Sequence, residues 1–261
     1  MEIMGILNIT PDSFSDGGKF SSIDAAVSQA KKMIADGAKI IDIGGESTRP
    51  DATFVTENEE LSRVIPIIRA IRAFSDIPIS IDTYKANVAR LAVDAGATMI
   101  NDVWAGRKDP LMYETMANVG VSVILMHNRK NEEENTICVN IIDEVISELQ
   151  RDIDAAISAG VKKENIIIDP GIGFGKTLEQ NIQLIKNIDK FKKLGYPVLL
   201  AASKKRTIKA LAMSEEIEGI ALATTAVTAF AFMNYIDFIR VHDVAENKLV
   251  IDVLTKLRQE V

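Results

Sequence analysis

Short runs of apolar residues recur eight times along the chain, and each run ends in polar or glycine residues. The runs span residues 3–7, 40–43, 77–81, 98–100, 121–126, 166–168, 198–202 and 236–239. Such lengths are typical of β-strands with both faces covered, which show an unbroken apolar stretch rather than an alternating one. The pattern therefore predicts eight buried strands.

The segments between these runs carry apolar residues at steps of three and four, the period of an amphipathic helix. Residues 23–34, 57–74, 141–157 and 178–191 show this period most clearly. Ser21 and Asp24 form a capping-box pattern, so the first helix is expected to begin near Ser21. Glycine is expected to end several helices in a left-handed conformation just before a strand. These positions are Gly37, Gly96, Gly120, Gly160 and Gly195.

Regular alternation of strand and helix predicts an α/β protein with a parallel sheet. Eight rounds in 261 residues favour a closed (β/α)8 TIM barrel that forms a single domain over residues 1–261. An open, doubly wound sheet is the alternative. In both folds the carboxyl ends of the strands carry the binding site, and the polar residues that end the eight runs lie there.

Composition narrows the class of protein. At 47% hydrophobic residues the chain can bury a large core. No uncharged apolar stretch reaches the about 18 residues of a membrane span, and the first residues lack a basic segment followed by a long apolar one. We therefore expect a soluble, cytoplasmic protein that does not contact membranes.

Charge and residue counts exclude further classes of site. One cysteine and two histidines exclude an internal disulfide and a zinc site of cysteines and histidines. A net charge of −7 argues against nucleic acid as the main partner. An anionic ligand would have to be held by local cations.

Two loops carry unusual combinations of residues. Residues 8–18, NITPDSFSDGG, are long for a connection between a strand and a helix, and we expect this loop to close over a ligand rather than only to join two elements. Residues 44–50, GGESTRP, place hydroxyls and a guanidinium directly after two glycines. Backbone amides approach a ligand closely at glycine, and arginine binds phosphate oxygens in a bidentate way.

The two loops are followed by five further stretches: residues 80–83 (SIDT), 100–102 (IND), 169–176 (DPGIGFGK), 203–205 (SKK) and 240–243 (RVHD). Together and in this order, they closely resemble the dihydropteroate synthase family, from residue 4 to about residue 254. The resemblance implies a (β/α)8 barrel. It also implies a homodimeric transferase of folate biosynthesis that joins 6-hydroxymethyl-7,8-dihydropterin diphosphate to p-aminobenzoate, releases pyrophosphate with Mg²⁺, and is a target of sulfonamides. Lys204 replaces the arginine that is common in the family, and the segment after His127 also departs from its pattern.

The pterin ring presents an edge of donors and acceptors, which a buried carboxylate and a side-chain amide can bind. Asp169 and Asn101 fit these roles. Asp82 would stabilise positive charge on the pterin methylene as the C–O bond breaks in an SN1-like reaction; the alternative is an N-cap for a helix starting near Tyr84. The expected pterin-binding residues are Asp82, Asn101, Val103, Met126, Asp169 and Lys205.

The leaving diphosphate needs cations and a metal. The residues expected to bind it are Asn8, Thr48, Arg49, Arg240 and His242, with Asn8 also reaching Mg²⁺, which takes few protein ligands. Those expected to line the p-aminobenzoate side are Phe14, Thr48, Pro50, Gly173, Phe174 and Ser203. Lys205 would contact both substrates unless it is a solvated lysine at a helix start. Since the aromatic amine is unprotonated at neutral pH, no strong base is required. The predicted catalytic residues are Asp82, Lys205, Arg240 and His242.

Three other features have ordinary explanations. Residues 171–177 look like a phosphate loop, but their glycine spacing fails and a pocket wall is favoured. His127 is expected to be a core histidine more often than a ligand. Residues 219–233 are apolar nearly all round, which predicts deep burial or a subunit interface.

Two rival functions remain open. A pterin-binding barrel of corrinoid methyltransferases would share Asp169 and Asn101 but would not need the diphosphate and aniline loops. A non-catalytic pterin-binding protein would keep the same pair and lose Arg49, Lys205 or Arg240. All three cations are present in this chain.

Overall fold

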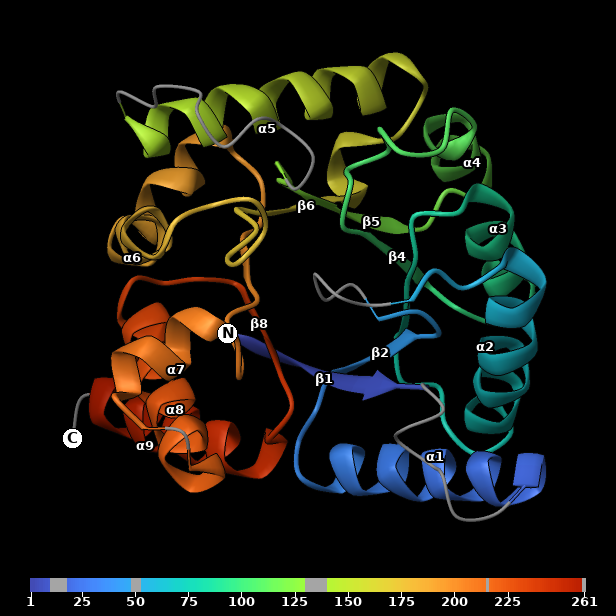
Figure 1. The fold of residues 1–261 in the computed structure, drawn as a ribbon, viewed down its shortest axis with the longest axis horizontal. Coiled ribbons are helices and arrows are strands. Elements are labelled where there is room, and N and C mark those ends of the chain that lie inside the picture. Colours follow the sequence, from blue (N-terminus) through green and yellow to red (C-terminus); the bar gives the residue numbers. More distant parts are fainter. Residues whose placement is uncertain (10–17, 48–52, 130–139, 215, 260–261) are drawn as a thin grey trace.

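The structure, a computed structural model, describes residues 1–9, 18–47, 53–129, 140–214 and 216–259. Eight strands lie at the centre and helices surround them (Figure 1). The strands are β1 (Glu2–Asn8), β2 (Ile40–Gly44), β3 (Ile79–Asp82), β4 (Met99–Asp102), β5 (Ser122–Met126), β6 (Ile166–Asp169), β7 (Leu199–Leu200) and β8 (Phe238–Val241). Each overlaps one of the eight apolar runs, so the strand prediction is confirmed.

The strands form one parallel sheet that closes on itself. Their order is β6-β5-β4-β3-β2-β1-β8-β7. The two end strands meet through a parallel bridge between Ile168 and Val198 and a hydrogen bond of 3.0 Å from Ile168 N to Pro197 O. An open sheet would leave these edges apart, so the (β/α)8 barrel is confirmed over the doubly wound alternative.

The helices follow the predicted alternation. They are α1 (Gly18–Ala35), α2 (Glu57–Arg72), α3 (Ala86–Asp94), α4 (Met112–Val119), α5 (Ile141–Ser158), α6 (Leu178–Lys186), α7 (Arg206–Ala212), α8 (Ile217–Met233) and α9 (Val244–Arg258), with 3-10 turns η2 (Lys163–Asn165) and η3 (Ile188–Leu194). The five glycines expected to end helices all have positive φ, between 66° and 120°. The prediction that these glycines adopt a left-handed conformation is therefore confirmed.

Two predicted helix boundaries are wrong. The first helix begins at Gly18, so position 21 lies inside it and not at its start. Serine is only mildly unfavourable within a helix, and a capping pattern alone does not fix the start. The predicted helix over 178–191 is broken at Asn187. The Asn187 side chain donates to Gln183 O at 2.9 Å, a local bond that competes with the regular helical pattern.

The barrel interior has an apolar floor below a polar upper part. A buried cluster fills the floor and consists of Met4, Ile40, Met99, Ile124, Ile167 and Leu199. Because strand side chains alternate between faces, Asp42 points inward between Ile41 and Ile43, which pack in the core cluster between strands and helices. The polar inward residues therefore gather nearer the carboxyl ends of the strands.

Helix α8 is apolar on its outer side as well as its inner side. Ile220, Thr224 and Phe232 are buried, whereas Leu222 and Met233 keep 70% and 57% of their surface exposed. Among the described residues no single helix is long and apolar enough to cross a bilayer, although α7 and α8, bent by 99° at their junction, reach that length and apolar content as a pair.

Candidate active site

Arg240 crosses the barrel from β8 and joins two carboxylates. Its Nε donates to Asp42 Oδ2 and its Nη2 to Asp82 Oδ2, both at 2.5 Å. Both acids are buried. Burial raises the pKa of Asp82 to about 7, even though the charge of Arg240 lowers it. The site therefore holds a cation and two acids away from bulk water, where charge interactions are strong.

Asp42 was not among the predicted site residues. It is fully buried and also lies 3.3 Å from the Asn101 side-chain nitrogen, so it holds both Arg240 and Asn101. The available signal was an acid within the otherwise apolar run 40–43, a position where only a paired carboxylate is tolerated. Its partners could not be identified from the sequence, because they come from other strands of the barrel.

Asn8, Gly44, Asp82 and Asn101 are successive Cα partners across β1 to β4. A Cβ at Gly44 would lie 3.8 Å from both Asn8 Oδ1 and Asp82 Oδ2. Glycine thus leaves space between the amide and the carboxylate. Asp82 does not cap a helix, because α3 begins at Ala86, and the N-cap alternative is excluded.

Asp169 and Lys205 lie on the neighbouring part of the rim. Asp169 Oδ1 accepts from Gly171 N at 2.7 Å, and burial raises the pKa of this acid. Lys205 Nζ donates to Ile172 O at 2.8 Å and lies 4.7 Å from the centre of the Phe174 ring. Burial lowers the pKa of Lys205 to about 8, opposed mainly by Asp169. Lys205 is therefore not a solvated lysine at a helix start.

An apolar wall accompanies these charged groups. Val103, Met126 and Phe174 form one buried cluster, against which Tyr84 and Trp104 pack. The three buried members follow β4, end β5 and follow β6, so predicted pterin and p-aminobenzoate contacts from three loops meet here.

Ser203 and His242 contact each other across the ends of β7 and β8. Ser203 Oγ lies 3.0 Å from His242 Nδ1 and accepts from His242 N at 3.2 Å. This serine thus orients the histidine predicted to face the diphosphate. Lys204, for which no role was assigned, pairs with Asp243 at 2.8 Å.

Four predicted site residues, Phe14, Thr48, Arg49 and Pro50, lie outside the described residues. The flanks of the second loop are nevertheless held firmly: Glu46 accepts from Val55 N at 3.4 Å and pairs with Lys85 at 2.5 Å. Lys85 also pairs with Glu60 at 2.5 Å. Sequence reasoning missed this cluster, because nothing in the pattern indicates that residues 46, 60 and 85 meet.

A hard divalent cation prefers oxygen ligands and keeps several waters. Within the described ranges no group of three or more His, Cys, Asp or Glu side chains forms a metal cage. Asn8 Oδ1 and the Asp82 carboxylate both lie next to Gly44, and the buried Asp82 Oδ1 accepts no hydrogen bond from the described part of the chain. This sparse oxygen set fits a magnesium ion that is bound mostly by substrate and water.

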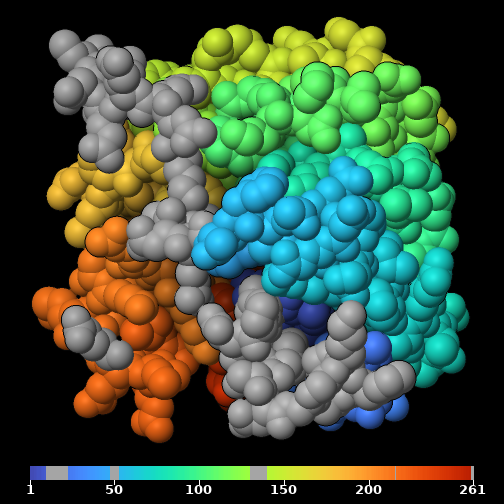
Figure 2. Space-filling model, turned by 45° about the vertical axis from the view of Figure 1, so that its right-hand side comes forward, coloured from blue at the N-terminus to red at the C-terminus, as the bar shows by residue number. Residues whose placement is uncertain are grey.

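The space-filling view shows how this region opens. Dark-blue atoms of β1 and red atoms of β8 are visible deep between the light-blue segment that precedes α2 and the orange residues around α7 (Figure 2). Parts of these two strands are therefore visible from outside between the two segments.

The chain is similar over nearly its whole length to known proteins. Residues 4–242 match the family model described as pterin binding enzyme. A dihydropteroate synthase of Clostridium beijerinckii is 53% identical over 94% of this chain and 90% of the relative. One of Bacillus subtilis is 49% identical over 94% of this chain and 84% of the relative.

Solved structures give the same result. Dihydropteroate synthase from Clostridium difficile, crystallised in the presence of pteroic acid, has a TM-score of 0.93 and 44% identity over 100% of this chain and 97% of that chain. The enzyme from Xanthomonas albilineans in complex with 7,8-dihydropteroate has a TM-score of 0.90 and 38% identity over 100% of this chain and 94% of that chain. Sequence, fold and the buried Asp, Asn, Lys and Arg groups agree, and the chain belongs to the pterin-binding enzymes, within the dihydropteroate synthase family.

Proposed function

We propose that the chain, as one barrel domain, condenses 6-hydroxymethyl-7,8-dihydropterin diphosphate with p-aminobenzoate to give 7,8-dihydropteroate and pyrophosphate. The observation that carries the proposal is the ion-pair cluster at the strand ends, where Arg240 donates to Asp82 and to Asp42, which also contacts Asn101. Acids for a pterin and cations for a diphosphate thus share one region, and relatives of this chain are solved with pteroic acid and 7,8-dihydropteroate.

The pterin ring would lie between Val103 and Met126 on one side and the polar strand ends on the other. Asp169 would accept N–H groups from the guanidine-like edge, and Asn101 would meet a neighbouring edge, with Val103 and Met126 packing on the ring. Buried polar groups reject analogues that leave them unpaired. The Asp42 contact supports this role for Asn101, because it limits how the amide can turn.

The C–O bond would break with its electron pair leaving on the diphosphate. Asp82 would stabilise the resulting methylene cation, and Arg240 and His242, with Thr48 and Arg49, would stabilise the diphosphate. The aromatic amine would then form the new C–N bond and lose a proton to water. Lys205 would contact both substrates.

Asn8 would hold Mg²⁺ near the Asp82 carboxylate. The ion would neutralise part of the diphosphate charge. The p-aminobenzoate would lie on the side of Phe174 and Gly173, and Phe14, Thr48, Pro50 and Ser203 complete the proposed set.

We also propose that the protein works as a homodimer in the cytoplasm. The exposed Leu222 and Met233 of α8, with Leu249, Val253 and Leu257 of α9, support an interface of this kind, because exposed apolar patches mark association sites. Sedimentation of the purified protein should give twice the mass of one chain; a monomer at micromolar concentration would defeat this part of the proposal.

The function is tested by measuring pyrophosphate release from the pterin diphosphate. Release coupled to formation of 7,8-dihydropteroate is expected only with p-aminobenzoate and Mg²⁺ present, and EDTA is expected to abolish it. Binding of the pterin without any release would favour a non-catalytic pterin-binding protein. Methyl transfer to a corrinoid without release would favour the corrinoid methyltransferase alternative.

A further inference from the structure

The loop between β6 and α6 forms one wall of the site and follows an unusual path. Gly171, Gly173 and Gly175 all have positive φ, between 64° and 85°. A Cβ at Gly171 would lie only 1.8 Å from His127 O, so this loop packs directly on the backbone that follows β5. Ile172 O and the Phe174 ring, both on this loop, contact Lys205.

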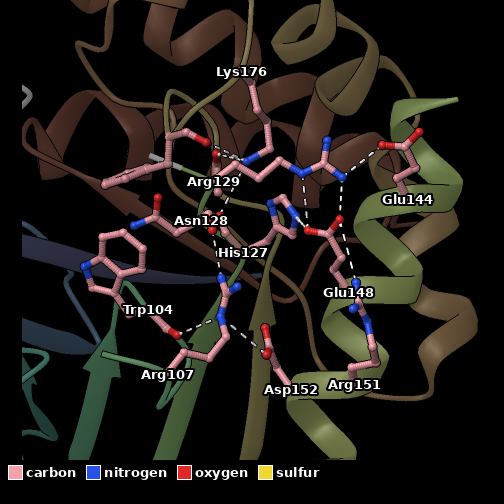
Figure 3. A network of polar contacts seen from close by, with 12 residues as sticks. Trp104, Arg107, His127, Asn128, Arg129, Glu144, Glu148, Arg151, Asp152 and Lys176 are labelled. Atoms are coloured by element: carbon pink, nitrogen blue, oxygen red, sulfur yellow. Dashed lines mark hydrogen bonds and ion pairs between the residues drawn. The ribbon is translucent and has the colours of Figure 1, made fainter. Parts of the chain in front are cut away.

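Lys176 holds this loop through hydrogen bonds to backbone carbonyls. Its Nζ donates to Gly171 O at 2.8 Å, to Phe174 O at 3.0 Å and to His127 O at 3.4 Å. One ammonium group thus uses three donors on three carbonyls, which belong to two loops (Figure 3). Burial lowers the pKa of Lys176 to about 7, with Asp169 as the main opposing charge, so this lysine is kept inside at an energetic cost.

The backbone at His127, to which Lys176 donates, is held rigidly. His127 is fully buried and its Nε2 lies 2.6 Å from Glu148 Oε2 on α5. Arg129 also pairs with Glu148, and Figure 3 shows the histidine ring, the arginine and the glutamate side by side. This environment fits the expectation that His127 is a core histidine. The His127 carbonyl is thus held in a fixed position, and the loop packs against it.

Helix α6 holds the same loop from its other end. The buried Asn181 side chain accepts from Gly173 N at 2.7 Å and donates to Thr177 O at 2.7 Å and to Lys176 O at 3.1 Å. Lys176 and Asn181 therefore fix residues 171–174 through contacts of their own, whereas Lys205 contacts Ile172 O and the Phe174 ring.

The backbone of Asp169 is held by the sheet rather than by Lys176, although its carboxylate accepts from Gly171 N of this loop. Asp169 lies in β6 with Met126 as its partner on β5, and its carbonyl accepts from His127 N at 2.9 Å. Loss of Lys176 should thus displace Phe174 and Ile172 more than the acid predicted to bind the pterin, whose backbone the strands hold.

We propose that Lys176 is a positioning residue that sets the affinity for p-aminobenzoate, by holding residues 171–174 where Phe174 and Lys205 form the wall for that substrate. The proposal rests on the proposed function. A purely structural role would affect both substrates alike, whereas this role separates them.

The test is Lys176→Met, which keeps most of the side-chain volume and removes all three donors. The KM for p-aminobenzoate should rise about tenfold or more, with the KM for the pterin diphosphate within about twofold of wild type. The matched control is Lys186→Met, the same change at an exposed lysine on α6, which should leave both KM values unaltered.

Asn181→Ala provides a second variant should Lys176→Met not fold, and the same separation of KM values is expected from it. Unchanged KM values in folded variants, or an equal rise for both substrates, would overturn the positioning role. A wild-type protein that releases no pyrophosphate would instead overturn the proposed function itself. Circular dichroism and thermal melting establish folding in each case.

Discussion

Lys205→Ala should lower the rate of condensation by about 10²- to 10³-fold or more while the protein remains folded, a loss of the size seen when a single group that stabilises a transition state is removed. The side chain contacts Ile172 O and the Phe174 ring and lies in the field of Asp169, at the centre of the proposed site. Removing a buried ammonium also removes its desolvation cost, so stability should change little. Pyrophosphate release and thermal melting measure the two effects separately.

The control for this variant is Lys209→Ala, an exposed lysine on the same short helix, α7. It should retain wild-type turnover. Because both changes remove one positive charge from the same region, a difference between them reports the position of Lys205 rather than net charge. Normal turnover by Lys205→Ala would remove its proposed catalytic role.

The barrel could be predicted from the sequence because its signals are local and repeated. Each strand is a short apolar run, and glycines such as Gly37 and Gly120 end helices in a conformation that other residues adopt only with strain. Helix boundaries were less predictable. Asn187 breaks a continuous apolar stripe through one side-chain hydrogen bond, which periodicity does not register.

The site was only partly predictable, for a related reason. Strand ends such as Asn101 and Asp169 could be recognised because topology brings all eight ends to one face. Asp42 lies within β2, before the end of the strand. Its role is evident only from its contact with Arg240, which lies 198 positions away in sequence. The hydrogen bonds that support the loops of the site, such as the one from Lys176 Nζ to His127 O, likewise join loops that are distant in sequence.

Arg240 combines structural and catalytic demands in one side chain. Its guanidinium pairs with Asp42 and Asp82, and the Asp82 carboxylate is expected to face the methylene cation. Burial favours the neutral form of Asp82, and the fixed cation of Arg240 opposes this effect on the pKa of that acid. The activity and the stability of this protein should therefore depend on the same ion pairs, and separating them requires a double variant.

Arg240→Met is expected to abolish measurable turnover and to destabilise the protein by about 3–5 kcal/mol, since it leaves two buried carboxylates without their partner. The pKa of Asp82, about 7 in the intact protein, should rise further when the attraction of Arg240 is lost. An acid whose folded-state pKa exceeds its unfolded value favours folding when protonated, so stability falls as the pH rises from the unfolded value toward the folded one. The destabilisation relative to wild type should accordingly be larger at pH 8 than at pH 5, measured by urea unfolding.

The double variant Arg240→Met, Asp42→Asn distinguishes the two roles. The second change removes one of the two orphaned charges but keeps Asp82, and an asparagine can still accept the hydrogen bond from the Asn101 amide at the position of Asp42. Much of the lost stability should return, because only one buried carboxylate then lacks a cation. Turnover should remain absent, since no guanidinium compensates the diphosphate as the C–O bond breaks. If pyrophosphate release recovered together with stability, Arg240 would serve the fold alone and the charge compensation proposed for it would have to come from other residues.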